Sequence, residues 1–110
     1  MGRHKELAFI IPAHNEAETI KITYASLCKL ADVVIVDDCS TDTTKNIAKN
    51  ISNHVITHKK KLGYSKAILT GLDYACRAGF RHAITIDADG QHDPKDAIKI
   101  ISQLKKGDAL

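Results

Sequence analysis

Polar side chains that could bind a ligand gather in three short segments of the 110-residue chain. The segments are residues 14–16 (His-Asn-Glu), 37–38 (Asp-Asp) and 87–92 (Asp-Ala-Asp-Gly-Gln-His), and each follows a run of apolar residues. When such runs form parallel strands, their carboxyl ends meet at one edge of the sheet, where open α/β folds bind ligands. We therefore expect one site built from all three segments. Strand-end acids can also serve only as helix caps, which is our interpretation of Asp42.

The last of these segments places two carboxylates, Asp87 and Asp89, two residues apart. They converge on one face if the chain stays extended, and they take separate roles if it turns, which Gly90 makes easy. A diphosphate beside these acids would be repelled by about 4 kcal/mol for each pair of charges ~4 Å apart. A divalent cation bound between the acids and the diphosphate would turn this repulsion into attraction. The oxygens of Asp89 and Gln91 suit Mg2+ or Mn2+. D-x-D spacing is common by chance, so it does not by itself establish a metal site.

Short apolar runs alternate with amphipathic stretches along the whole chain. In chain order the predicted elements are a strand at 7–11, a helix at 16–29, a strand at 33–36, a helix ending at 50, a strand at 54–57, a helix at 64–78, a strand at 83–86 and a helix at 94–106. Continuous apolar runs are typical of strands buried on both faces of a parallel sheet. This alternation predicts a Rossmann-like α/β fold with three layers, α/β/α, and the clustering of strand-end acids favours strand order 3-2-1-4.

The helix at 64–78 illustrates how the core is expected to form. Its apolar spacing predicts that Ile68, Leu72 and Ala75 are buried. Gly79 is expected to end the helix in a left-handed conformation. The lysines at 59–61 precede it, and we interpret them as a solvated loop, with a phosphate-facing patch as the alternative.

Composition excludes several function classes. Aromatic residues make up only 5% of the chain, too few for the stacking platforms of single-stranded nucleic-acid binders, so no nucleic-acid partner is expected. The three cysteines are odd in number and lack metal-ligand spacing, which favours reduced thiols and a cytoplasmic protein. No apolar run approaches the roughly 20 residues of a membrane span. Four histidines are interpreted as surface or strand-end residues rather than ligands: His4, His54, His58 and His82.

Four motifs together are far more specific than any one of them. They are I-P-A-H-N-E (11–16), V-I-V-D-D-C-S-T-D-T-T (34–44), L-G-Y-S-K-A-I-L-T-G (62–71) and D-A-D-G-Q-H-D-P (87–94). In order and spacing the chain resembles family 2 glycosyltransferases, especially the polyprenyl- (dolichyl-) phosphate sugar transferases, over nearly all of residues 7–110. The resemblance implies that residues 1–110 are the nucleotide-sugar-binding part of a GT-A-type domain.

The resemblance also implies roles for individual residues. The residues implied to hold the nucleotide sugar are Pro12, His14, Glu16, Asp38, Asp87 and Asp89. Asp38 matches the acid that hydrogen-bonds the base. Asp87, Asp89 and Gln91 match the ligands of a Mg2+ or Mn2+ ion beside the diphosphate.

For a full-length protein the resemblance implies metal-dependent, inverting transfer of a sugar from a GDP- or UDP-linked donor to an acceptor such as a polyprenyl phosphate. The catalytic base is expected beyond Leu110, because the chain resembles only the N-terminal part of the family. The chain alone is therefore expected to be inactive. It could also form homo-oligomers through an uncovered sheet edge. A lipid acceptor would place the protein in the cytoplasm, peripherally at the cytoplasmic face of the membrane.

Three alternatives stay open at this point. A receiver domain shares the α/β alternation, but it needs its Asp pair after the first strand, whereas 37–38 follows the second. A haloacid-dehalogenase-like phosphatase has a motif similar to I-T-I-D-A-D-G, but it wants Thr or Val where Gln91 stands. The third alternative is a non-catalytic remnant that binds nucleotide or nothing.

Overall fold

The computed structural model describes residues 4–89, which form four strands and three helices. In chain order these elements are β1 (His4–Ala13), α1 (Ile20–Leu27), β2 (Ala31–Asp37), α2 (Thr44–Ile51), β3 (His54–Thr57), α3 (Tyr64–Arg77) and β4 (His82–Thr85). The helix predicted at 94–106, together with Gln91 and His92, lies outside the described residues. Among the described helices, none is long and apolar enough to cross a membrane.

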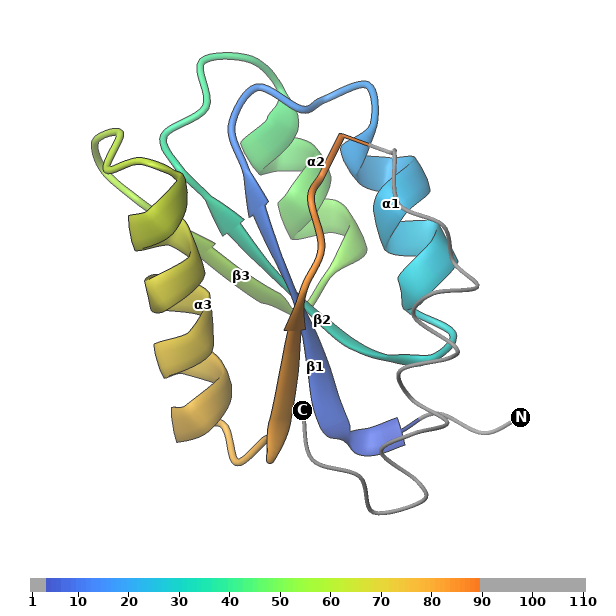
Figure 1. Cartoon of the computed structure of the whole chain (residues 1–110). Coiled ribbons are helices and arrows are strands. Elements are labelled where there is room, and N and C mark those ends of the chain that lie inside the picture. The colour runs from blue at the N-terminus through green and yellow to red at the C-terminus, as the bar shows by residue number, and fades with distance from the viewer. Residues whose placement is uncertain (1–3, 90–110) are drawn as a thin grey trace.

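The strands form one parallel sheet in the order β3-β2-β1-β4, which confirms the predicted topology. Figure 1 shows α1 and α2 on one face of this sheet and α3 on the other, so the three-layer prediction is also confirmed. β1 lies between β2 and β4, and the carboxyl ends of all strands point to the same edge. The loops that follow β1, β2 and β4 therefore meet there.

The central strand β1 divides its side chains between two cores. Phe9 and Ile11 belong to the core that includes α1 and α2 residues, whereas Ala8 and Ile10 belong to the core under α3. All four side chains are fully buried. This explains why the run at 7–11 is continuously apolar: alternate residues of a strand point to opposite faces, and both faces are covered.

β1 continues two residues beyond the predicted strand, through Pro12 to Ala13. The backbone N–H of Ile86 donates to the carbonyl of Ile10, so Ile10 faces β4. Pro12, two residues further on, directs its nitrogen to the same side. There β4 no longer pairs with β1, whose last partner pair is Ile10 with Thr85. The missing N–H of proline therefore costs no hydrogen bond of the sheet.

α1 is shorter than predicted. Residues 17–19 form a turn, and the helix begins only at Ile20. The backbone N–H groups of Thr19 and Ile20 both donate to the carbonyl of Glu16. This turn keeps Glu16 at the carboxyl edge of the sheet rather than within a helix.

α3 packs on the sheet through its small residues, which corrects one prediction. Its buried residues are Ala67, Gly71 and Ala75, whereas Leu72 is 37% exposed and Ile68 is only partly buried. A Cβ atom on Gly71 would lie 2.3 Å from Cγ2 of Ile10, so only glycine allows this approach. Hydrophobic spacing favours large side chains, but the close contact with the sheet selects small ones. The predicted left-handed end of the helix is confirmed, because Gly79 has φ +92°.

We expect Gly71→Ala to destabilise the protein. The added methyl must displace Ile10 in a packed core, which costs about 1–3 kcal/mol. The gain of about 1 kcal/mol in helix propensity offsets only part of this. Urea unfolding should therefore give a lower free energy of unfolding than for the parent chain. Ser65→Ala, on the exposed side of the same helix, is the control and should change it by less than about 0.5 kcal/mol. A Gly71→Ala protein as stable as the parent would contradict the close packing.

Candidate nucleotide-sugar site

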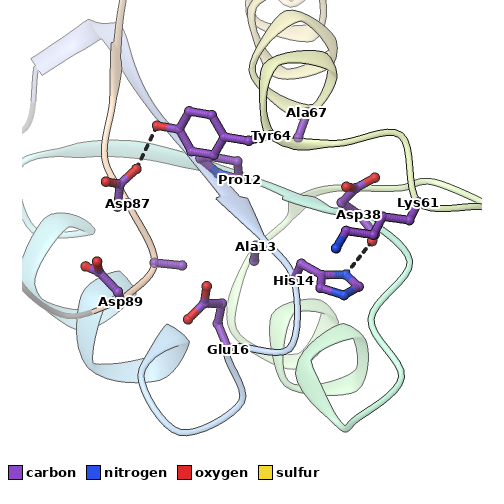
Figure 2. A pocket seen from close by; sticks show the side chains of 11 residues that line it. Pro12, Ala13, His14, Glu16, Asp38, Lys61, Tyr64, Ala67, Asp87 and Asp89 are labelled. Carbon is purple, nitrogen blue, oxygen red and sulfur yellow. Dashed lines mark hydrogen bonds between the residues drawn. The ribbon is translucent and has the colours of Figure 1, made fainter.

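A pocket of about 310 Å³ lies at the carboxyl edge of the sheet, between the loops after β1, β2 and β4 and the start of α3. All six residues predicted to hold the nucleotide sugar line it (Figure 2). The complete lining is Pro12, Ala13, His14, Glu16, Asp38, Lys61, Tyr64, Ala67, Asp87, Ala88 and Asp89. Residues up to 77 positions apart in the sequence are thus brought to one place, as the strand-end rule predicts.

The loop after β1 is fixed to the loop after β2. Asn15 has φ +54°, a left-handed conformation that asparagine tolerates better than most residues. Its backbone N–H donates to Oγ of Ser40 (3.0 Å), and its Oδ1 accepts from the backbone N–H of Thr41 (2.8 Å). The N–H of Glu16 donates to Oγ1 of Thr44, the first residue of α2 (2.9 Å). These bonds hold 14–16 against the pocket.

His14 is oriented by the same pair of loops. Its Nδ1 lies 2.7 Å from the backbone carbonyl oxygen of Asp38, an acceptor only, so Nδ1 carries the proton. Asn15 Nδ2 lies 3.4 Å from Nε2 of the ring, which is then the acceptor. The imidazole is therefore held at the pocket wall rather than free to rotate.

Asp42 acts at the start of α2, as predicted, but from one residue before the N-cap, which is Thr43. Its carboxylate accepts from the backbone N–H of Thr44 (2.9 Å) and from the Thr44 hydroxyl, so it satisfies the first N–H of the helix. These two hydrogen bonds, first that of the hydroxyl, hold the pKa of Asp42 below its usual value. Asp42 does not line the main pocket.

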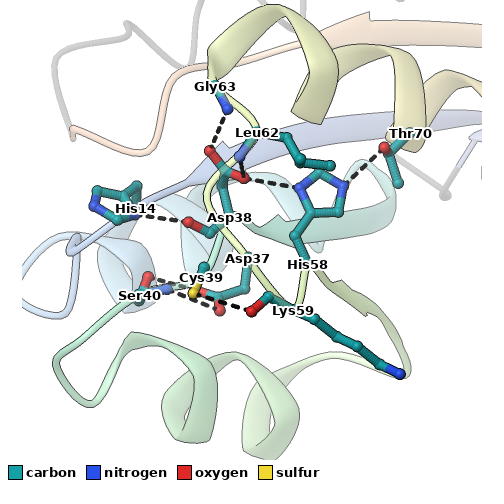
Figure 3. Close-up of polar contacts among 10 residues, drawn as sticks. All are labelled: His14, Asp37, Asp38, Cys39, Ser40, His58, Lys59, Leu62, Gly63 and Thr70. Carbon is teal, nitrogen blue, oxygen red and sulfur yellow. Dashed lines mark hydrogen bonds and ion pairs between the residues drawn. The ribbon is translucent and has the colours of Figure 1, made fainter.

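Asp38 is the most heavily hydrogen-bonded side chain of the site (Figure 3). Oδ1 accepts from Nδ1 of His58 (2.8 Å) and from the N–H of Leu62 (2.8 Å), and Oδ2 accepts from the N–H of Gly63 (2.9 Å). Burial alone would raise the pKa of Asp38. The hydrogen bonds from Leu62, His58 and Gly63 outweigh burial and hold the pKa below its usual value. Asp38 is therefore ionised at neutral pH.

His58 is a strand-end residue, as predicted, but it is not a surface residue. His4, His54 and His82 do begin strands, but His58 follows β3, and its side chain is only 9% exposed. It is buried because both ring nitrogens have partners: Asp38 at Nδ1 and the hydroxyl of Thr70 at Nε2 (2.9 Å). Only the folded arrangement of α3 beside β2 brings these groups together.

The opposite side of the pocket is acidic. Glu16, Asp87 and Asp89 all line it (Figure 2). Burial, and then the negative charges of Asp89, Asp42 and Asp87, raise the pKa of Glu16. Mutual repulsion of this kind is what a bound cation would relieve. Within residues 4–89, no group of three or more His, Cys, Asp or Glu side chains is arranged to hold a metal ion. Since Gln91 lies outside that range, the predicted metal site stays a prediction.

The D-A-D segment is held over the pocket by its middle residue. Ala88 is 2% exposed and belongs to the core of α1 and α2. Its carbonyl accepts from Oγ1 of Thr19 (2.5 Å). Asp87 and Asp89, on either side of it, are both exposed and both line the pocket. The chain turns at residues 88–89 rather than staying extended, so the two carboxylates reach the pocket from different positions, as in the alternative with separate roles.

Tyr64 is a pocket residue that the sequence analysis missed. Its hydroxyl donates to Oδ1 of Asp87 (2.7 Å), which links the start of α3 to the loop after β4 (Figure 2). This hydrogen bond first, then burial and the charges of Asp87 and Asp89, raise the pKa of Tyr64. No sequence signal specifies this pairing, because Tyr64 and Asp87 are 23 residues apart. Lys61 also lines the pocket, beside Asp38 and His14 rather than beside Asp87 and Asp89 (Figure 2).

Comparison with known proteins identifies the family. Residues 8–110 match the sequence model described as Glycosyl transferase family 2. The chain belongs to glycosyl transferase family 2. This membership decides against the receiver-type and phosphatase alternatives and supports a glycosyltransferase enzyme.

One family 2 relative is the UDP-N-acetylglucosamine–dolichyl-phosphate N-acetylglucosaminyltransferase of Methanococcus voltae. It is 36% identical over 91% of this chain, which spans 47% of the relative. The chain thus spans about half the length of the curated relatives that it matches.

Two solved structures share the fold. Residues 1–349 of S. aureus TarS, in complex with UDP, superpose with a TM-score of 0.67 at 28% identity, covering 89% of this chain and 32% of that one. Glucosyl-3-phosphoglycerate synthase of Mycobacterium tuberculosis, in complex with Mn2+, UDP and glucosyl-3-phosphoglycerate, gives a TM-score of 0.71 at 22% identity, covering 89% and 39%. Both likenesses support the GT-A-type architecture.

Proposed function

We propose that this chain holds the UDP-sugar of a metal-dependent glycosyltransferase that transfers the sugar, with inversion, to a polyprenyl phosphate. One observation carries the proposal: six residues from the end of β1 and the loops after β1, β2 and β4 line one pocket at the carboxyl edge of the sheet, with Asp38 and His14 on one side and the acids Glu16, Asp87 and Asp89 on the other. The M. voltae relative uses a UDP-linked donor and a dolichyl-phosphate acceptor, and the TarS structure contains UDP.

The number of acceptor positions left on the Asp38 carboxylate favours uracil over guanine. A carboxylate has about four acceptor positions, and three of them are used by donors of the protein. The position that remains is on Oδ2. Uracil offers a single ring N–H, which one acceptor satisfies. Guanine offers a ring N–H and an adjacent amino group, and binding both would require Asp38 to release a protein donor. We therefore assign a UDP-linked rather than a GDP-linked donor.

The acidic side of the pocket suits a divalent cation. Glu16, Asp87 and Asp89 would repel a diphosphate, and Lys61 is the only lysine or arginine among the described lining residues. Hard carboxylate oxygens are the ligands that Mg2+ and Mn2+ prefer. Asp87 and Asp89, with Gln91, would hold the ion. The cation, when bound, stabilises the negative charge that develops on the departing diphosphate. Tyr64 keeps Asp87 oriented through its hydroxyl, and His14 forms the nucleoside wall.

The proposed acceptor, a polyprenyl phosphate, is inferred from the M. voltae relative and not from residues of the pocket. A polyprenyl phosphate is a lipid, so the protein would act in the cytoplasm, at the cytoplasmic face of a membrane. The described residues contribute the donor side, and the group that activates the acceptor is not assigned to any of them.

Thermal unfolding with a panel of nucleotides tests this donor assignment. In Mn2+, UDP-N-acetylglucosamine and UDP are expected to raise the Tm of the chain. A ligand at 100 times its Kd stabilises by about 2.7 kcal/mol, which shifts the Tm of a domain this size by several degrees. GDP-mannose and ATP at the same concentration should shift it much less. An equal shift by GDP-mannose would contradict uracil selection, and the absence of any shift by UDP-sugars would contradict the proposed function.

A further inference from the structure

His58 occupies a position that connects three elements without lining the pocket. It follows β3, bonds the loop after β2 through Asp38, and bonds α3 through Thr70 (Figure 3). Its backbone N–H also donates to the carbonyl of Asp37 (2.8 Å). A residue with these contacts can act on a ligand only through its neighbours.

Those neighbours are the nucleotide-binding wall. The segment 58–63 leaves β3 at His58 and enters α3 after Gly63. Asp38 binds both ends of the segment: Nδ1 of His58 at the start, and the N–H groups of Leu62 and Gly63 at the end. The segment is thus closed over a single carboxylate, and Lys61, within it, lines the pocket.

The imidazole has a second effect, on Asp38 itself. Two donors, His58 and Leu62, saturate Oδ1, so the acceptor position that remains for a base is on Oδ2. If His58 were absent, Oδ1 would regain an open position and the carboxylate could rotate. The Nε2–Thr70 contact prevents the ring itself from turning, because it anchors the far side of the imidazole to α3.

We propose that His58 is a positioning residue for nucleotide recognition: it orients the Asp38 carboxylate toward the base and holds the Lys61-bearing segment in the pocket wall. This inference rests on the proposed function. Its specific consequence is that His58 affects affinity for the nucleoside part of the ligand and leaves affinity for the diphosphate part unchanged. The acids proposed to face the diphosphate come from the loops after β1 and β4, whereas the side-chain hydrogen bonds of His58 go to Asp38 and Thr70.

Calorimetric titration of two His58 variants tests this role, with UDP and with inorganic pyrophosphate as probes in Mn2+. His58→Phe keeps a ring of similar shape and removes both polar contacts. Losing a hydrogen bond to an ionised group should weaken UDP binding by about tenfold or more. Pyrophosphate binding should stay within about twofold, since no base is involved. His58→Asn keeps a donor at the place of Nδ1 and should restore UDP affinity to within about threefold of the parent.

The matched control is His54→Phe. His54 lies at the other end of β3, and its Nδ1 bonds the hydroxyl of Tyr74 on the same helix α3 (2.7 Å). Its removal also deletes an imidazole contact to α3, but far from the pocket residues. It should lower Tm without changing UDP affinity. If His58→Phe does not fold, Thr70→Val, which removes only the partner of Nε2, should still weaken UDP binding relative to pyrophosphate.

The outcomes separate the two proposals. Unchanged UDP affinity in His58→Phe, or an equal loss for UDP and pyrophosphate, overturns the positioning role while leaving the proposed function intact. Failure of His58→Asn to restore binding also overturns it. If the parent chain binds pyrophosphate but not UDP, the donor assignment itself is wrong, and the role of His58 falls with it.

Discussion

Asp89→Ala is expected to remove the Mn2+-dependent part of UDP binding. In the presence of Mn2+ the variant should bind UDP about tenfold to a hundredfold more weakly than the parent, the loss of a close carboxylate–cation interaction. In EDTA the substitution should no longer weaken UDP binding. One of the acids that line the diphosphate side is then gone, so metal-free UDP should bind at least as well as to the parent.

This opposite behaviour with and without metal is what identifies a cation ligand. A variant that merely disturbed the loop after β4 would lose affinity under both conditions. Asp73→Ala removes the same charge from the exposed surface of α3, where Asp73 pairs with Arg77 (3.1 Å). It should leave both affinities unchanged. Equal weakening of UDP binding by Asp89→Ala in Mn2+ and in EDTA would show that Asp89 is not a metal ligand.

Asp38→Ala is expected to lower the free energy of unfolding by about 2–4 kcal/mol. Three donors lose their common acceptor: Nδ1 of His58 and the N–H groups of Leu62 and Gly63. Each buried donor left unsatisfied costs about 1–3 kcal/mol, and water entering from the pocket recovers part of it. Urea unfolding at neutral pH measures the loss. A change below about 0.5 kcal/mol would contradict the closure of segment 58–63 by this carboxylate.

The Asp38 carboxylate also makes the free energy of unfolding depend on pH. The folded-state pKa of Asp38 lies below its usual value. The unfolded state therefore takes up the proton first, and the stabilisation is complete above the ordinary aspartate pKa of about 3.9. It is lost as the pH falls below that value through the folded-state pKa. The stability difference between the parent and Asp38→Ala should accordingly shrink as the pH is lowered from 5 towards 3.

Much of the fold follows from local sequence patterns. The continuous apolar runs identified the central strands β1 and β2, because a parallel sheet covered on both faces buries its central strands, whereas the edge strands β3 and β4 are only partly buried. The carboxyl ends of the strands located the pocket, and all six nucleotide-site residues named from the motifs line it. Helix faces were less predictable. Leu72 was expected inside and Gly71 was not considered, because the distance between α3 and the sheet decides which side chains fit.

The roles of His58 and Tyr64 could not be predicted from the sequence. Each acts through a partner more than 10 residues away: His58 through Asp38 and Thr70, and Tyr64 through Asp87. Neither the basic run beside His58 nor the helix start at Tyr64 specifies such a pairing. It depends on how α3 is placed relative to the loops after β2 and β4, which is a property of tertiary packing.

Isothermal titration of this chain with UDP, in Mn2+ and then in EDTA, tests the central claim most directly. We expect one UDP to bind per chain in Mn2+, with an affinity at least tenfold weaker in EDTA, because the acids of the pocket then face the diphosphate without a cation. Equal affinity under the two conditions would contradict the metal-dependent site. No binding of UDP in Mn2+ would contradict the assignment of this pocket to a nucleotide sugar.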